Sequence, residues 1–249
     1  MRREFDEMAT LPIPVLFDAD DLVVVDKPAG LPTVPAPGAP ADASVRAVLE
    51  RQLGARLWVV HRLDQDTSGV IVFARTAAVH RALCLAFEAR QARKTYVAFT
   101  LGAPAPREGR IDTPLHPARR GKVRPALPGE AGAWKSATRY VVRRRWEREG
   151  ASVAMVDAHP ETGRRHQIRA HLRSIGTPVL FDHLYGRASA GAGLDDAPVS
   201  RLALHASRLV LPDPAAPGRT HEFEAPLPAD LAALFRWLDG TWTAGRGEA

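Results

Sequence analysis

HRLDQDTSGV, residues 61–70, is the stretch that says most about how this chain folds. It is a polar segment between two apolar runs, residues 57–60 and 70–74, which have the composition of short β-strands. We therefore expect a tight turn that joins two strands, with Asp64 close to Arg62. A carboxylate near a guanidinium is held in its ionised form, because an opposite charge favours the charged state. Asp64 is thus a candidate nucleophile or general base.

A purely structural aspartate is the alternative interpretation of Asp64. In that role its carboxylate would accept hydrogen bonds from the amides of the turn at residues 67–69. Asp66 fits that task better, since an aspartate side chain readily bonds backbone amides two residues further on. From the residues alone, both roles stay open for Asp64.

The rest of the chain contains more β-rich runs than helical ones, separated by segments rich in proline and glycine. The predicted strands are residues 22–25, 70–74, 96–101, 137–142, 153–156, 202–211 and 222–223. The predicted helices are residues 45–53 with Ser44 as the cap, 77–91, 166–175 with Gly176 as the stop, and 229–238. Strands and helices do not alternate strictly, which excludes a doubly wound parallel sheet. The predicted fold class is α+β, with a mixed, mainly antiparallel sheet and flanking helices. We expect one domain over residues 1–249, with flexible ends at 1–14 and 240–249.

The charge of the chain favours a polyanionic partner. The formal net charge is +6 and the pI is about 10.1. Only 4 of the 34 cationic residues are lysines. Arginine binds phosphate with two hydrogen bonds and stacks on bases, so this bias suits nucleic acid. A GC-rich coding sequence is the alternative explanation for so much arginine.

Cysteine content and hydropathy exclude several other classes of protein. Cys84 is the only cysteine, which excludes an internal disulfide and a multi-cysteine zinc site. The first residues carry charges with no apolar segment after them, so no secretory signal is expected. No apolar run is long enough to span a bilayer. We therefore expect a cytoplasmic protein that does not bind a membrane.

A second group of functional residues lies in ETGRRHQIRAHL, residues 161–172. On a helix, Arg165, Arg169 and Arg173 share one face, and no acidic residue dilutes them. Because these guanidinium groups repel one another, we expect an anion against this face, either phosphates or a buried carboxylate. A solvated basic face is the alternative.

Two weaker signals lie elsewhere in the chain. In RKTY, residues 93–96, Tyr96 leads a strand and could stack on a nucleobase, although strand tyrosines are commonly core residues. In DKPAGL, residues 26–31, Lys27 is either a pocket residue or an ordinary turn lysine. The chain lacks a phosphate-binding Walker motif, a dinucleotide-binding glycine motif and a zinc-binding HExxH motif. We therefore expect no metal and no organic cofactor.

Taken together, these motifs resemble those of the RluA-type pseudouridine synthases, in the same order and at similar separation. The segments that carry the resemblance are residues 26–31, 61–70, 93–96, 162–172 and 202–209. The resemblance implies a mixed sheet with a central catalytic cleft. It also implies isomerisation of uridine in a stem-loop of ribosomal RNA or tRNA. The base leaves the stack, the glycosidic bond breaks, and the rotated uracil is rejoined through carbon 5.

The resemblance also implies roles for individual residues. Asp64 is the catalytic aspartate, Tyr96 packs against the flipped uracil and assists proton handling at carbon 5, and Arg169 forms an ion pair with Asp64. Arg62 enters the RNA stack where the uridine leaves. The remaining expected RNA or pocket contacts are His61, Lys94, Arg164 and His166. Whether Asp64 attacks ribose carbon 1′ or removes the 2′ proton is open at this point.

Two features set this chain apart within the family. The family often has glycine before aspartate in a GDxxYG segment, whereas this chain has Phe181 before Asp182. The chain also resembles the compact subgroup that lacks an N-terminal RNA-binding appendage, and we expect it to be a monomer. One alternative function is a non-catalytic RNA-binding protein that retains the fold. Another is a deaminase or a glycosylase; a deaminase would need a zinc site that Cys84 alone cannot make.

Overall fold

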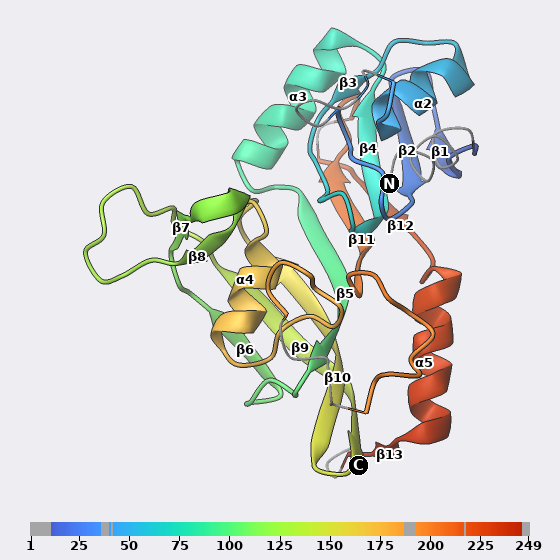
Figure 1. Ribbon diagram of the computed structural model, residues 1–249. Coiled ribbons are helices and arrows are strands. Elements are labelled where there is room, and N and C mark those ends of the chain that lie inside the picture. The colour runs from blue at the N-terminus through green and yellow to red at the C-terminus, as the bar shows by residue number, and fades with distance from the viewer. Residues whose placement is uncertain (1–10, 36–39, 41, 187–192, 217, 246–249) are drawn as a thin grey trace. The chain divides into compact units, whose positions relative to one another are not determined.

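The computed structural model describes residues 11–245, except 36–39, 41, 187–192 and 217. Contacts within the chain group it into two compact units (Figure 1). Unit 1 comprises Met1–Lys94 and Ala206–Pro226, and unit 2 comprises Thr95–His205 and Leu227–Ala249. Each unit is built from two separate stretches of sequence, so no single linker marks the division. The single domain expected over residues 1–249 stays a prediction.

Unit 1 is built on a mainly antiparallel sheet. The strand order is β1 (Val15–Asp18), β2 (Leu22–Lys27), β4 (Ser68–Ala74) and β11 (Leu204–Pro212, in this unit from Ala206), with β3 (Trp58–Val59) pairing with β4 and β12 (Thr220–Glu224) pairing with β11. All of β4 is buried, as expected for a strand whose residues 70–74 form a continuous apolar run. This strand follows directly on the HRLDQDT segment and fixes where that segment ends.

Two helices accompany this sheet, α2 (Val45–Leu53) and α3 (Ala77–Glu88). Ser44 caps α2, as predicted, by accepting a hydrogen bond from the amide of Ala47 at 3.3 Å. Thr76 caps α3 in the same way through the amide of Val79 at 3.2 Å. Figure 1 shows α3 alongside β3 and β4, which places it next to the polar segment between these strands.

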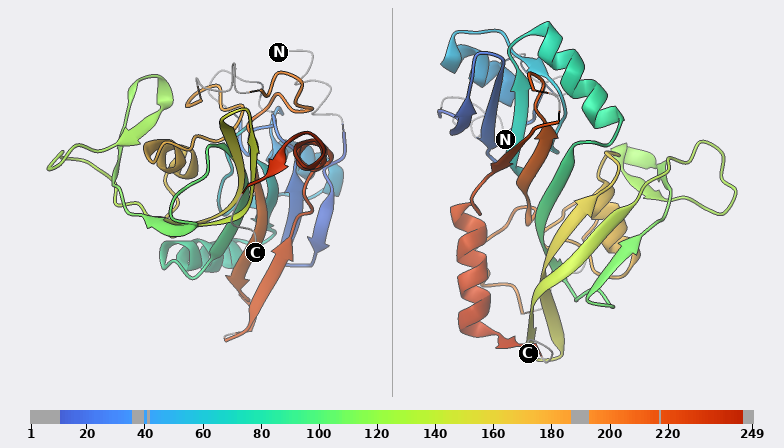
Figure 2. Two further views of the ribbon diagram at one scale, coloured as in Figure 1. Left: turned by 90° about the horizontal axis from the view of Figure 1, so that it is seen from below. Right: turned by 180° about the vertical axis from the view of Figure 1, so that it is seen from behind.

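The paired strands of unit 2 run antiparallel to one another. The strand order is β5 (Arg93–Leu101, in this unit from Thr95), β10 (Ala151–Pro160), β9 (Thr138–Arg148) and β13 (Thr243–Ala244), with β6 (Glu108–Ile111) also pairing with β9. A separate hairpin of β7 (Leu115–Pro117) and β8 (Val123–Pro125) encloses the 3₁₀ turn η1 (Arg119–Gly121). Helix α4 (Gln167–Ser174) contacts β8, β9 and β10, and Figure 2 shows it beside the hairpin.

Helix α5 (Ala229–Thr241) packs on the unit 2 sheet through an aromatic cluster. The fully buried Trp146 stacks on Phe99 at 6.2 Å and meets the edge of Phe235 at 5.6 Å between ring centroids. Its indole N–H donates to Asp239 at 2.7 Å. The indole nitrogen is therefore satisfied inside the core, as a buried tryptophan requires.

The α+β fold class with a mainly antiparallel sheet is confirmed, and so are the predicted strands and the four helices of the described residues. The expected flexible ends at residues 1–14 and 240–249 stay a prediction. Ile13 is buried and its backbone N–H and C=O both bond to the side chain of Gln52, at 2.9 and 3.0 Å. At the other end, α5 continues to Thr241 and β13 follows. Residues 1–10 and 246–249 lie outside the described residues.

Among the described residues, no helix combines the length and the apolar character needed to cross a membrane.

Candidate active site

Asp64 lies in a loop of unit 1, residues 60–67, between β3 and β4; we call it the Asp64 loop. The loop closes with a backbone hydrogen bond, in which the N–H of Thr67 donates to the carbonyl of Asp64 at 3.1 Å. The expectation that Asp66 caps this turn with its side chain is wrong, because its carboxylate bonds no described residue. A backbone hydrogen bond therefore closes the turn, and the carboxylate of Asp66 takes no part in it.

Two side chains from earlier in the sequence anchor the residues on either side of Asp64. The hydroxyl of Thr33 donates to the carbonyl of Leu63 at 3.1 Å and accepts from its N–H at 3.2 Å. The ammonium group of Lys27 donates to the carbonyl of Gln65 at 2.8 Å. Lys27 and Thr33 are both buried. Asp64 is therefore held between two fixed neighbours before any substrate binds, as a preorganised catalytic group requires.

His61 anchors the start of the Asp64 loop. Its ring stacks on Phe87 of α3 at 4.7 Å between centroids, and its Nε2 accepts the N–H of Val72 in β4 at 3.3 Å. Burial, with a smaller contribution from the charge of Lys94, lowers the pKa of His61 to about 3. The ring is therefore neutral near pH 7 and packs as a structural group. A contact between His61 and RNA stays a prediction, and it would not be an ionic one.

Arg62 and Lys94 are the two positively charged residues of unit 1 that we expect to contact RNA. Arg62 is exposed and forms no ion pair with Asp64, although the two are close in sequence. Lys94 is half-buried, and burial lowers its pKa to about 8. Its ammonium group therefore remains mostly charged at neutral pH. Both side chains keep a charge that phosphate can use.

In unit 2, Arg169 of α4 is buried and bound to a carboxylate. Its side chain is 4% exposed, and its Nε and Nη2 donate to the two oxygens of Asp182 at 2.7 and 2.8 Å. Burial alone would raise the pKa of Asp182, but the hydrogen bonds and charge of Arg169 hold it below the usual value. The prediction that a buried carboxylate or a phosphate must face the arginine-rich helix is confirmed for Arg169.

Tyr185 joins Arg169 to His166. The guanidinium carbon of Arg169 lies 5.1 Å from the centroid of the Tyr185 ring. The hydroxyl of Tyr185 accepts the N–H of Val123 at 2.7 Å and bonds Nδ1 of His166 at 3.2 Å. His166 has φ +49°, a left-handed conformation at the start of α4. The structure therefore brings two of the predicted site residues together at one tyrosine.

Gln167 holds the GRRHQIR segment on the sheet. Its Oε1 accepts from the hydroxyl of Thr162 at 2.6 Å and from the N–H of Arg164 at 3.1 Å. Its Nε2 donates to the carbonyl of Ala137 at 2.9 Å. This buried amide thus fixes the approach to α4, from which Arg164 emerges exposed.

Arg164 and Arg165 lie beside the β7–β8 hairpin. Nε of Arg164 donates to the carbonyl of Lys135 at 3.3 Å. Arg165 packs against η1 so closely that a methyl group on Gly121 would come within 2.9 Å of Nη2. We call Arg119, Lys122, Lys135, Arg164 and Arg165 the basic surface. Within the described ranges none of these five has a carboxylate partner.

Phe181 occupies a backbone conformation that favours glycine. Its φ is +56°, in the left-handed region where a side chain crowds the backbone. This conformation suits the glycine that the family resemblance leads us to expect at this position. The next residue, Asp182, still bonds Arg169, so the change to Phe181 leaves that ion pair intact.

Some of the predicted site residues belong to unit 1 and the others to unit 2. Unit 1 contains Asp64 with His61, Arg62 and Lys94. Unit 2 contains Arg169 with Arg164, His166 and Tyr96. Tyr96 is buried on β5, where its Cα pairs with that of Ala158 on β10.

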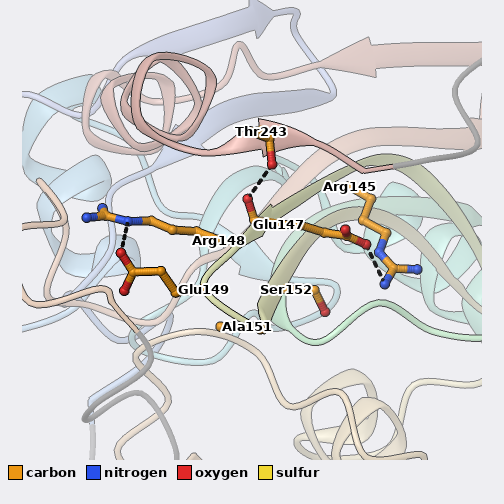
Figure 3. Close-up of a pocket in the computed structure, with 8 residues that line it drawn as sticks. Arg145, Glu147, Arg148, Glu149, Ala151, Ser152 and Thr243 are labelled. Carbon is orange, nitrogen blue, oxygen red and sulfur yellow. Dashed lines mark hydrogen bonds and ion pairs between the residues drawn. The ribbon is translucent and has the colours of Figure 1, made fainter.

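Other possible sites are less convincing. In the described part of the chain, no group of three or more His, Cys, Asp or Glu side chains is placed to hold a metal ion. A surface hollow of about 400 Å³ lies where β9, β10 and β13 meet (Figure 3). Its charged side chains bond one another, Arg145 with Glu147 and Arg148 with Glu149, and it includes none of the predicted site residues.

The sequence did not predict the contacts that hold the site residues. Thr33 lies 30 residues before Leu63, and no spacing rule connects them. Asp182 was noted only as part of a motif. A buried arginine needs a carboxylate, but the sequence alone does not show that Arg169 is buried, and Asp182 follows it by 13 residues.

The sequence of this chain is similar to those of known RNA pseudouridine synthases. A sequence profile of the family described as RNA pseudouridylate synthase matches residues 21–174. The chain is 38% identical to the dual-specificity RNA pseudouridine synthase RluA of Escherichia coli O6:H1, over 85% of this chain and 92% of that protein. It is 39% identical to an uncharacterized RNA pseudouridine synthase of Chloroflexus aurantiacus, over 86% of this chain. This chain spans only 65% of the length of that second relative.

Solved structures agree with the sequence comparison. The human protein RNA Pseudouridylate Synthase Domain Containing 4 superimposes with a TM-score of 0.74 at 26% identity. The match covers 96% of this chain and 98% of that one. The human Domain Containing 1 protein has the same fold, with a TM-score of 0.73 at 24% identity over 94% of this chain and 89% of that one.

Proposed function

We propose that this chain, which belongs to the RNA pseudouridylate synthase family, converts uridine to pseudouridine within structured RNA. The observation that carries the proposal is the Asp64 loop. It presents one carboxylate between neighbours that Thr33 and Lys27 hold in place. A nucleophile or base whose position is fixed in advance lowers the entropic part of the barrier. The matched family profile includes this loop.

The proposed reaction needs only groups of the chain itself. The target uridine is extruded from the RNA stack, and its glycosidic bond breaks with the bonding electrons leaving on the uracil. Asp64 either attacks ribose carbon 1′ or removes the 2′ proton. The uracil then turns and bonds carbon 1′ through its carbon 5, which displaces Asp64 from carbon 1′ or is followed by return of the proton to carbon 2′. Carbon 5 loses its proton to solvent, and nitrogen 1 of the uracil takes one up. Atoms and electrons balance, because pseudouridine is an isomer of uridine.

Two residues of unit 2 have proposed roles in this reaction. Arg169 is proposed to pair with Asp64. A buried guanidinium is suited to that role, because in a low-dielectric site its charge acts strongly. Tyr96, which is buried on β5, is proposed to pack against the extruded uracil and to assist proton handling at carbon 5.

The proposed partner is RNA, a stem-loop of ribosomal RNA or of tRNA. Relatives are named ribosomal large subunit pseudouridine synthase D and dual-specificity RNA pseudouridine synthase. The basic surface supports this proposal, because its side chains are available to phosphates. Arg62, Lys94 and His166 are proposed as further RNA contacts, with His61 as a neutral one. We also propose that the protein acts as a monomer in the cytoplasm.

The proposal is tested with ribosomal RNA and tRNA transcripts that carry tritium on uracil carbon 5. The protein is incubated with them in the presence of a chelator. We expect tritium release to equal the pseudouridine found after digestion to nucleosides. A glycosylase would yield free uracil instead, and a non-catalytic RNA-binding protein would bind without any release. No release from any transcript by correctly folded protein would contradict the proposal.

A further inference from the structure

The ion pair between Arg169 and Asp182 is almost completely buried. The side chain of Asp182 is 0% exposed and that of Arg169 is 4% exposed. Taking two charged groups out of water is costly, and hydrophobic residues of similar volume often serve stability equally well. A pair of this kind therefore calls for an explanation other than stability alone.

The geometry of the pair fixes the guanidinium in more than one direction. Asp182 accepts from Nε and Nη2, which sets the plane and the rotation of the group. The ring of Tyr185 lies 5.1 Å from the guanidinium carbon and limits movement out of that plane. Arg169 is thus held in one orientation.

Asp182 is itself fixed by the backbone. Its Oδ1 accepts the N–H of Leu184 at 2.9 Å and the N–H of Tyr185 at 3.0 Å. The same short segment therefore supplies the carboxylate, its two amide donors and the aromatic ring. Because the carboxylate of Asp182 is held in this way, its two hydrogen bonds fix the orientation of the Arg169 guanidinium.

We propose that Asp182 is a positioning residue, which orients the guanidinium of Arg169 for the catalytic carboxylate. This inference rests on the proposed function, since it acts through the role assigned there to Arg169. Asp182 touches no reacting atom; it acts on the reaction through Arg169 alone. A misplacement of about 1 Å in such a group is enough to lower turnover about 100-fold.

Asp182→Asn is the main test variant. The side-chain oxygen of asparagine still accepts from the amides of Leu184 and Tyr185, but its NH₂ group cannot accept from Nε of Arg169. We expect kcat for pseudouridine formation to fall about 100-fold while KM changes less than about threefold. Circular dichroism and thermal unfolding establish that the variant is folded.

A second ion pair in unit 2 provides a matched control. Arg201 donates to Asp230 through the same two nitrogens, Nε at 2.6 Å and Nη2 at 2.9 Å. Asp230 also accepts a backbone amide, that of Leu231, at 2.7 Å. Asp230→Asn makes the same chemical change in a pair that has no proposed catalytic role. We expect its kcat to remain that of the unchanged protein.

A double variant separates positioning from a general structural effect. In an Arg169→Lys background the bidentate geometry is already lost, so adding Asp182→Asn should lower kcat by less than about threefold more. A further loss of about 100-fold in that background would overturn the inference. So would an unchanged kcat for folded Asp182→Asn, provided that the unchanged protein forms pseudouridine. If the unchanged protein forms none, the proposed function fails first.

Asp182→Glu keeps the inference testable if Asp182→Asn does not fold. This variant retains the charge and moves the carboxylate by one methylene. We expect it to fold and to lose kcat at nearly constant KM. An unchanged kcat, or failure of both variants to fold, would show that Asp182 serves the fold and not the orientation of Arg169.

Discussion

His61 shows how a residue in a functional motif can serve the fold. Its pKa is lowered to about 3, whereas an unfolded histidine titrates near 6.5. Because the folded value is the lower one, protonation favours the unfolded state. The neutral ring makes its full contribution to the free energy of unfolding above about pH 6.5. This contribution is lost as the pH falls from there towards 3.

We expect His61→Gln to weaken the pH dependence of the free energy of unfolding. Between pH 6.5 and 4.5 one such group contributes at most about 1.4 kcal/mol per pH unit, and the variant should lose most of that slope. Urea unfolding at several pH values measures it, with the exposed His183→Gln as the control. His171, whose pKa burial also lowers, continues to contribute in the same direction. Equal slopes for the His61 variant and the unchanged protein would contradict the account.

The sequence identified the site residues better than it identified their surroundings. Asp64 and Arg169 stand out because a carboxylate in a strand-joining turn and an undiluted row of arginines are both unusual. Asp182, Thr33 and Lys27 do not stand out, because their partners lie 13 to 38 residues away. Such contacts depend on how the chain folds back on itself, which local patterns do not encode.

At the scale of elements, Gly69 in strand β4 lies so close to strand β11 that only glycine fits there. It has φ +116°, and a Cβ atom built on it would collide with the backbone of Ala206 in β11. Glycine is therefore needed for two reasons: its backbone conformation and the close approach of the neighbouring strand. The glycine of the first motif is thus a requirement of the sheet in unit 1.

We expect Gly69→Ala to destabilise the protein by about 3 kcal/mol or more, because backbone atoms cannot move aside. Gly54→Ala is the matched control: Gly54 also has a positive φ, +62°, but nothing lies within 4 Å of its Cβ position. That variant should cost only about 1 kcal/mol. Urea midpoints compare the two. Similar losses would show that the contact with β11 is not what requires glycine.

The sequence predicted the long apolar strands and the capped helices, and it failed on short or polar strands. Ser44 marks the start of α2, and residues 70–74 of β4 are all apolar. In contrast, β6 and the β7–β8 hairpin have no alternating pattern. β6 is a strand because the longer β9 offers it an edge to pair with, whereas β7 and β8 pair with each other.

At the scale of the whole molecule, the net charge of +6 does not say where the charge acts. Many arginines are neutralised by neighbouring acids, among them Arg143, which bonds Asp157 at 2.7 Å. The basic surface, in contrast, has no carboxylate partner in the described ranges. The sequence does not predict that the basic surface forms beside α4, because η1 and α4 are more than 40 residues apart in the chain.

We expect Arg119→Ala and Arg164→Ala each to weaken RNA binding. Each should also reduce the slope of log affinity against log salt concentration by about one, because one phosphate contact is lost. Arg143→Ala is the matched control, since an arginine already paired with an acid releases few counterions from RNA. Fluorescence anisotropy at several salt concentrations measures the slopes. An equal change in all three variants would contradict the assignment of the basic surface to RNA.

The central claim is that Asp64 carries the chemistry, and the nearby Asp66 gives the sharpest comparison. Pseudouridine formation on ribosomal RNA and tRNA transcripts is measured by nucleoside chromatography for Asp64→Asn and for Asp66→Asn. We expect Asp64→Asn to lose at least about 1,000-fold in turnover while RNA binding persists, and Asp66→Asn to stay close to the unchanged protein. Undiminished turnover by Asp64→Asn would contradict the account.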